Sequence, residues 1–318
     1  MTDRSLFHSF PRPKSGETPP QTAERGLRIL RYMVDVGLVL APELVTWDHR
    51  DSEPTKLLQR RICFTELSLA ELPEHSKTFG PFSLQCSPAR LRAAGAMPVI
   101  YAPQAIDGHP NSGIAEFCVK AATHTKYVLE RLEELKKLAL ELETGHYKGI
   151  PVQPGVVVNL RNTDLEGNAV SEYPIKAEDL AGLMRYLGFR NIPFDHSIGM
   201  LGVYENMFYP TDNTHVDDQL GYYRQREWRL VGSDIAINGH RLTRELAEDE
   251  RKTIETIDSE FWTREFTVSG AAVSRSALAQ IYSPQTSSAL GDIVEKILVP
   301  SSAEAAVRKI FDGNIQVM

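Results

Sequence analysis

Glu227 is a carboxylate flanked by three arginines, Arg224, Arg226 and Arg229. A carboxylate in this setting can stabilise a cation that develops on a sugar, or hold a ribose hydroxyl, while guanidinium groups neutralise phosphate charge. The alternative is a ladder of arginine–carboxylate pairs along one face of a strand. Glu227 is therefore the first candidate for a chemical role, with Arg226 and Arg229 as candidate anion ligands.

Further polar side chains lie at the ends of expected strands, where a rigid scaffold can direct them into a cleft. His8 could hydrogen-bond a ribose or a diphosphate, although a histidine on an aromatic strand also suits a core. Thr65 and Glu66 follow a buried strand, and Glu66 could equally cap the next helix. Tyr101 could stack on a base or complete a core strand, and His75 suits the end of a helix.

Several common motifs are missing. The sequence has no GxGxxG after a strand, no GxxxxGK[ST] and no GxSxG, so the classical dinucleotide, P-loop and hydrolase patterns are not indicated. The nine histidines have no HExxH or HxxxH spacing, so no metal site is predicted. Cys63, Cys86 and Cys118 lie in unlike contexts and are expected to be reduced thiols.

Composition sets broad limits. The 318 residues are 42% hydrophobic, which is typical of a globular protein and excludes collagenous, coiled-coil and wholly disordered classes. The net charge of −7 provides no overall attraction for a polyanion. Nucleic acid could therefore bind only through a local basic patch, for which Arg60 and Arg61 could join the arginines around Glu227. The apolar stretch 32–45 is too short for a membrane helix, so we expect a cytoplasmic protein without membrane association.

The first hundred residues alternate between strand and helix patterns. The expected strands cover residues 6–10, 61–65, 82–84 and 97–101. The expected helices run from a cap at Thr22 to Gly37, from 68 to 74 with His75 at the end, and from 88 to 94. This order predicts a mixed α+β fold.

The sequence predicts one domain over residues 1–318, with two elaborations at 103–215 and 232–290. The first contains a long helical pattern at 112–143, a strand at 156–160 and a helix at 178–187. A strand within 222–231, an acidic helix at 245–260, a strand at 293–299 and a helix at 302–311 follow. The leucine stripe of the long helix, with Leu132, Leu135 and Leu142, could hold a partner or a second copy.

A set of short pieces in a fixed order resembles the AbiGi family of bacterial abortive-infection proteins. These pieces are LFH at 6–8, GLRIL at 26–30, GL at 37–38, ICFTE at 62–66, His75, FGPF at 79–82, PVIY at 98–101 and REWR at 226–229. The resemblance covers residues 5–102 and 222–231 and, loosely, 293–311. It implies a role in phage defence, usually as the antitoxin of a two-gene system.

The same pieces are more distantly similar to the ADP-ribosyltransferase layout of the DarT toxins and the RNA phosphotransferases. That likeness implies a split-sheet core with flanking helices and a helical insertion, and NAD as substrate. It implies that His8 contacts the NAD ribose and that Glu227 promotes loss of nicotinamide and transfer. Phe64 corresponds to an aromatic position that is often tyrosine in those enzymes. The expected NAD-binding residues are Phe64, Thr65, Glu66, Tyr101, Arg226 and Arg229.

Three functions follow as hypotheses. The first is an antiphage protein that is an NAD-dependent ADP-ribosyltransferase acting on a nucleic acid or a protein. The second is a non-catalytic antitoxin or sensor subunit that binds a partner toxin or a phage component. The third, a metal-dependent nuclease using Glu66, His75 and Glu227, has the least support because no ligand pair has helical i, i+4 spacing.

Overall fold

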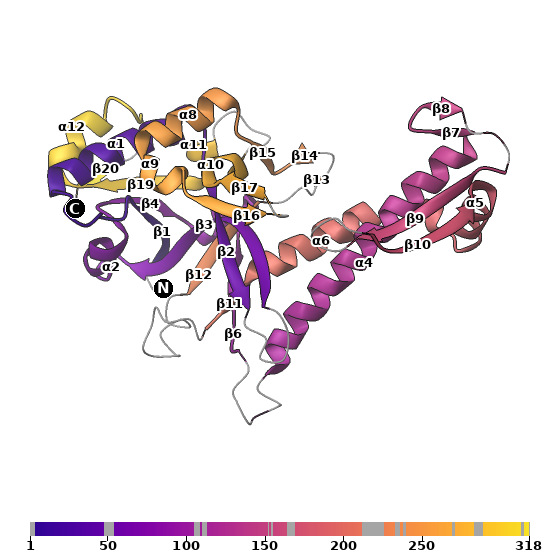
Figure 1. Ribbon diagram of the computed structural model, residues 1–318. Helices are drawn as coiled ribbons and strands as arrows, with labels where there is room; N and C mark the ends of the chain where they lie inside the picture. Colours follow the sequence, from indigo (N-terminus) through magenta and orange to yellow (C-terminus); the bar gives the residue numbers. More distant parts are fainter. Residues whose placement is uncertain are drawn as a thin grey trace. The chain divides into compact units, whose positions relative to one another are not determined.

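The computed structural model describes residues 4–47, 54–104, 109, 113–151, 153, 155–163, 169–211, 226–232, 236–237, 240–268, 271–282, 289–312 and 315–317. This part of the chain is mixed α+β, as the sequence predicts (Figure 1). The chain divides into two compact units. Unit 1 comprises residues 1–119, 203–266 and 273–318, and unit 2 comprises residues 120–202 and 267–272.

The centre of unit 1 is a ten-stranded sheet with the order β15-β18-β2-β3-β1-β4-β19-β20, to which β12 and β5 add beside β3. Its strands are β1 (Arg4–Phe10), β2 (Val39–Trp47), β3 (Thr55–Ser68), β4 (Phe82–Cys86), β5 (Met97–Pro98), β12 (Glu227–Val231), β15 (Thr243–Glu245), β18 (Gln280–Tyr282), β19 (Val294–Val299) and β20 (Ile315–Val317). The β19–β20 pair is parallel, whereas the other pairs with a known register are antiparallel. The sheet is therefore mixed, and it does not close.

The long strand β3 is the branch point of this sheet. Its first half pairs with β2, from Thr55 to Arg61, and its last residues pair with β1, from Thr65 to Ser68. Strand β12 pairs with residues 61–65 and therefore lies along the opposite edge. Thus β1 and β2 share one edge of β3 and part from each other near Cys63.

The two faces of this sheet are unlike. Because side chains alternate along a strand, Leu6, Ile62, Phe64 and Leu230 point to one face, where they join the main apolar core. The core also receives side chains from helices α1, α3, α11 and α12. Phe7 points to the opposite face, where it packs in a smaller apolar cluster with Leu72 of helix α2. Helices therefore cover both faces of the β1–β3–β4 region.

The helices of unit 1 begin and end largely where local chemistry requires. They are α1 (Pro19–Asp35), α2 (Leu72–Phe79), α3 (Pro88–Ala93), α8 (Glu248–Ile257), α9 (Ser259–Trp262), α10 (Arg275–Leu278), α11 (Ala289–Ile293), η3 (Ser301–Ala303) and α12 (Glu304–Val307). Helix α1 is capped by Thr18, whose backbone N–H donates to Gln21 at 2.9 Å, and Gly37 follows its end with φ 127°. The predicted cap at Thr22 is wrong, because Thr22 lies buried in the first turn.

Other boundaries differ from the sequence predictions. Strand β3 continues to Ser68, and α2 starts only at Leu72, where Pro73 fits the first turn, so His75 lies within this helix and not at its end. Strand β2 was not predicted, because Pro42 interrupts its pattern. The helix expected at 302–311 is limited to η3 and α12. The strand expected at 97–101 is split into β5 and β6 (Ile100–Ala102), and β6 pairs with β11 (Phe208–Pro210) in a separate parallel sheet.

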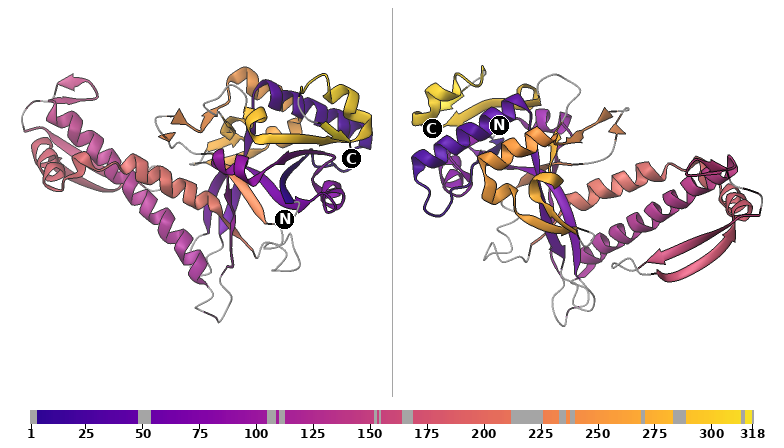
Figure 2. Two further views of the ribbon diagram at one scale, coloured as in Figure 1. Left: turned by 180° about the vertical axis from the view of Figure 1, so that it is seen from behind. Right: turned by 45° about the horizontal axis from the view of Figure 1, so that its top comes forward.

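Helix α4 (Ile114–Glu143) confirms the long helical pattern, and α6 (Phe194–Met207) is the second long helix in this region (Figure 2). Both helices contribute residues to both units. In the described residues, no helix combines the length and the apolar character that crossing a membrane requires.

Unit 2 has its own small core. It contains residues 120–143 of α4, the hairpin of β9 (Val157–Thr163) and β10 (Ala169–Lys176), α5 (Ala177–Tyr186) and η2 (Phe189–Asn191). Leu135, Leu138 and Leu142 pack against a cluster that includes Leu180 and Met184. Two of the leucines that were predicted from the sequence to form a partner surface, Leu135 and Leu142, therefore pack into this core.

Six short strands complete the description of both units. They are β7 (His146–Tyr147), β8 (Ile150–Pro151), β13 (Ala236–Ile237), β14 (His240–Arg241), β16 (Glu265–Val268) and β17 (Ala271–Ser274).

Gly80 fixes the approach of α2 to β1. It follows the last turn of α2 with φ 123°, a backbone conformation that residues with a Cβ rarely adopt. A Cβ at this position would lie 2.4 Å from the Phe10 carbonyl carbon and 2.4 Å from the Pro11 oxygen. Because both neighbours are backbone atoms, they cannot move away independently of the strand.

We expect Gly80→Ala to lower the free energy of unfolding of unit 1 by about 3 kcal/mol or more, from the left-handed backbone and the overpacking together. Gly16→Ala is the matched control, since Gly16 has φ 78° and nothing within 4 Å of an added Cβ. It should cost about 1–2 kcal/mol, for the backbone alone. Urea unfolding followed by tryptophan fluorescence measures both, because Trp47, Trp228 and Trp262 all belong to unit 1. Equal effects of the two substitutions would show that the Gly80 contact is not tight.

Candidate functional site

Both carboxylate oxygens of Glu227, the first residue of β12, are engaged. Oε1 accepts a hydrogen bond from Nε of Arg229 at 2.7 Å, and Oε2 accepts one from the Tyr101 hydroxyl at 3.0 Å. The Glu227 side chain is 12% exposed and that of Arg229 is 1% exposed. Residues 227 and 229 lie on the same face of β12, which is why the ion pair can form within one strand.

Arg229 uses its remaining donors on groups from other elements. Its Nη1 donates to Oε1 of Gln59 at 3.3 Å and to the backbone oxygen of Asn206 at 3.2 Å. The guanidinium lies over the ring of Tyr209, with its carbon 4.9 Å from the ring centroid. Arg229 therefore connects β12 to β3, α6 and β11.

A second arginine joins the same cluster from β3. Arg61 donates to Oε1 of Gln59 and, at 2.6 Å, to Oε2 of Glu43, and its guanidinium lies 5.2 Å from the centroid of Tyr209. We refer to Glu43, Gln59, Arg61, Glu227 and Arg229 as the arginine network. It holds two guanidinium groups and two carboxylates, so its charges balance.

The network also sets the protonation of its neighbours. Burial alone would raise the pKa of Glu227, but the charge and the hydrogen bond of Arg229 outweigh burial and lower it. Burial and the nearby Glu227 carboxylate raise the pKa of the Cys63 thiol to about 12, and burial raises the pKa of Tyr101. At neutral pH Glu227 is thus ionised, Cys63 is a thiol and Tyr101 keeps the proton that it donates.

His8 lies on the other face of the sheet. Its Nδ1 is 2.9 Å from the Cys63 backbone oxygen, at the point where β1 and β2 part. Its ring stacks on Phe10 and contacts Phe64, with centroid distances of 5.8 Å in both cases. Burial lowers the pKa of His8 to about 4, so the neutral ring donates Nδ1–H to the carbonyl.

The other predicted site residues lie in three different places. Thr65 pairs directly with Glu227 across the β3–β12 ladder. Phe64 is fully buried in the main core, on the same face as His8. Glu66 and Arg226 form a partly exposed ion pair of 3.5 Å, and Arg226 has φ 44°. The structure therefore brings together Glu227, Arg229, Tyr101 and Thr65, whereas His8 and Phe64 face the opposite side.

The basic patch proposed from the sequence is not assembled from these arginines. Arg61 and Arg229 are buried and paired with carboxylates, and Arg60 donates to the Leu278 backbone oxygen at 2.6 Å. Arg224 lies outside the described residues. Arg226 is 39% exposed and pairs with Glu66 at 3.5 Å. Each of the described arginines of the proposed patch therefore already has a partner within the protein.

His75 projects from α2, with its Nδ1 at 3.2 Å from the Ser9 hydroxyl and its ring stacked on Phe79. Burial lowers its pKa to about 4. Glu66 pairs instead with Arg226 and, at 4.0 Å, with Arg4. Among the described residues, no group of three or more His, Cys, Asp or Glu side chains is arranged to hold a metal ion.

Gln59, Glu43 and Tyr209, which belong to this site or lie beside it, were not predicted from the sequence. One signal was available: Gln59 and Arg61 are two residues apart in β3, which places both polar side chains on one face of the strand. Glu43 and Tyr209 gave none, because their proximity depends on long-range strand pairing.

The comparison with protein families gives one match. A family model described as "Putative abortive phage resistance protein AbiGi, antitoxin" matches residues 48–261, which is more than half of the chain. The match includes β3, β12 and most of the arginine network, whereas β1 and α1 lie outside it. No curated protein and no solved structure matches the chain.

Removing one partner of the Glu227–Arg229 pair should cost about 3–5 kcal/mol of unfolding free energy, because the other charge stays buried. We expect this for Glu227→Gln and for Arg229→Met. The double variant should lose clearly less than the sum of the two single losses. Denaturant unfolding of all four proteins gives the coupling energy, and additive losses would mean that the two side chains do not interact.

The low pKa of His8 predicts acid sensitivity. The unfolded chain binds a proton near the ordinary pKa of 6.5, whereas the folded protein does so only near 4. Stability is therefore highest above pH 6.5. Protonation of His8 lowers the free energy of unfolding by about 3 kcal/mol as the pH decreases toward 4, in addition to the fall that His75 contributes because its pKa is also lowered to about 4.

His8→Asn, which can keep an N–H near the position of Nδ1–H, should flatten this part of the pH profile. His146→Asn is the control, because His146 is exposed and belongs to unit 2. Urea unfolding at pH 8, 6.5, 5.5 and 4.5 measures the effect. Identical profiles for wild type and His8→Asn would contradict the assignment.

Proposed function

The chain belongs to the AbiGi family, and we propose that it acts in abortive phage resistance by binding a partner protein, without catalysis of its own. The observation that supports this most is the state of Glu227. The one carboxylate with a predicted catalytic role has both oxygens engaged by Arg229 and Tyr101. In this proposal Glu227 stabilises the fold through these two contacts.

The family description supports the same proposal from a separate direction. It contains the term antitoxin, which implies a partner toxin. The partner expected from this description is a protein encoded with this chain in a two-gene system. A phage component is the other partner that the second sequence hypothesis allows.

A transferase that uses NAD is the second candidate, and one observation favours it. Strands β1 and β2 share one edge of β3 and part from each other near Cys63, as a split-sheet core would require. The expected site residues do not fit one ligand, however. His8 and Phe64 face the apolar core, whereas Glu227 and Arg229 face the other side of the sheet. This distribution over both faces of the sheet is a reason to prefer the binding proposal over one NAD molecule that contacts all of these residues.

Two measurements on the purified full-length protein separate the candidates. The first is binding to the product of the adjacent gene, by isothermal titration calorimetry, together with plaque assays in cells that carry both genes. We expect a defined complex and phage resistance that depends on both genes. No complex, with resistance intact in cells that lack the second gene, would contradict the proposal.

The second measurement is mass spectrometry after incubation with NAD, alone and with lysate from infected cells. We expect neither free nicotinamide nor an ADP-ribosyl adduct. Turnover by the wild type that is lost in a folded Glu227→Gln variant would overturn the binding proposal and establish the transferase.

A further inference from the structure

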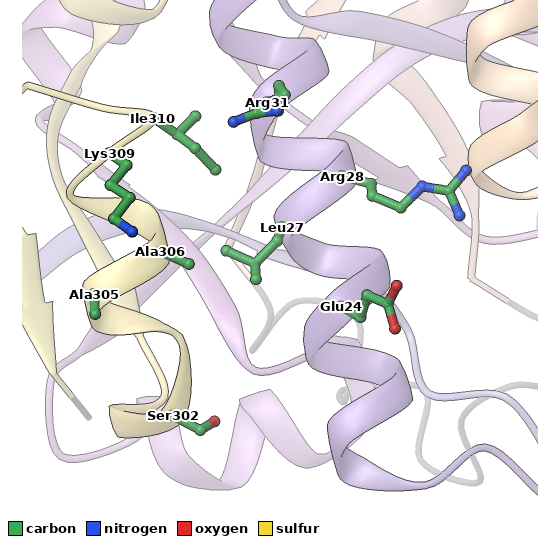
Figure 3. Close-up of a pocket in the computed structure, with 9 residues that line it drawn as sticks. All are labelled: Glu24, Leu27, Arg28, Arg31, Ser302, Ala305, Ala306, Lys309 and Ile310. Atoms are coloured by element: carbon green, nitrogen blue, oxygen red, sulfur yellow. The ribbon is translucent and has the colours of Figure 1, made fainter.

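An open groove in unit 1, with a volume of about 510 Å³, lies between α1 and the segment formed by η3, α12 and the residues that follow α12 (Figure 3). We refer to it as the α1–α12 groove. Its volume falls in the range of binding clefts. It is lined by Glu24, Leu27, Arg28, Arg31, Ser302, Ala305, Ala306, Lys309 and Ile310.

The floor of the groove is apolar and shallow. Leu27 is partly buried against the main core, and Ile310 lies opposite it (Figure 3). Ala305 and Ala306 present only methyl groups, so α12 leaves space between itself and α1. The floor can therefore accept apolar side chains from outside without movement of the two helices.

The rim of the groove carries more positive than negative charge: its lining has the cations Arg28, Arg31 and Lys309 and one carboxylate, Glu24, which lies on α1 away from Arg31 and Lys309 (Figure 3). Arg31 and Lys309 are exposed and approach the same end of the groove, near Ile310 (Figure 3). Neither has an ion-pair partner among the described residues. Arg28 points to the other side of α1, where it donates to the Thr256 backbone oxygen at 2.6 Å. In a chain of net charge −7, two free cations beside an apolar floor favour an acidic ligand.

Both walls of the groove lie outside the residues that match the family. Helix α1 ends at Asp35 and the other wall starts at Ser301, whereas the match covers 48–261. The groove is thus built by the two ends of the chain, apart from the arginine network.

We propose that the α1–α12 groove binds an acidic amphipathic helix of the partner protein. This inference rests on the proposed function. A helix is the expected form because its apolar side chains, spaced three or four residues apart, would lie along the valley between two helices. Its acidic residues would pair with Arg31 and Lys309.

The test uses the purified full-length protein and the product of the adjacent gene. In Arg31→Glu/Lys309→Glu, repulsion replaces attraction, so Kd should rise roughly tenfold or more. Ala305→Trp should weaken binding to a similar extent, because it fills the groove from an exposed position. The control is Lys56→Glu/Arg92→Glu, which makes the same change of net charge at exposed positions of unit 1 and should leave Kd unchanged. Thermal unfolding confirms that each variant is folded.

The outcomes separate this inference from the proposed function. If the wild type binds no partner, the proposed function itself fails. If the wild type binds and the groove variants bind equally well, the partner docks elsewhere and the groove inference fails alone. Analytical ultracentrifugation of the chain alone gives the remaining outcome: a dimer that both groove variants abolish would assign the groove to a second copy and overturn the proposal.

Discussion

The ion pair of Glu227 and Arg229 lies two residues apart on one strand and is almost completely removed from water. Burying a guanidinium and a carboxylate is costly unless each finds good geometry and further hydrogen bonds. Here those bonds come from Tyr101, Gln59 and the backbone of Asn206. Strands β3, β6 and β12 and the end of α6 must therefore be in place together for the pair to be stable. The central part of unit 1 is organised around this requirement.

The pair also explains why the two faces of the sheet differ. Strands β3 and β12 carry Phe64, Ile62 and Leu230 on one face and the arginine network on the other. Because side chains alternate along a strand, each residue of β3 and β12 faces either the apolar core or the arginine network, and not both. His8 belongs to the apolar face, and its hydrogen bond satisfies a carbonyl where β1 and β2 part. Its neutral state follows from this position.

The sequence predicts the fold class and many elements because local signals determine them. Helix α4 and helix α1 follow from apolar periodicity, and Gly37 follows the end of α1 as expected. The arrangement of the site could not be predicted in the same way. Arg226 and Arg229 look alike in the sequence, but one lies before β12 and is partly exposed, whereas the other is buried within it. That difference depends on the pairing of β12 with β3, which joins residues more than 160 positions apart. The sequence therefore identifies Glu227 as notable without showing that its partners lie within the protein.

The family match and the structure together assign different work to different parts of the chain. Residues 48–261 contain four members of the arginine network, Gln59, Arg61, Glu227 and Arg229, while Glu43 lies just outside. In this network the charges balance and both oxygens of Glu227 are engaged, so a ligand that binds Glu227 or Arg229 would have to replace an existing contact. The α1–α12 groove is the opposite case, with free cations beside an apolar floor. On the binding function that we propose, the matched region would supply much of the stable framework and the α1–α12 groove the surface that meets the partner.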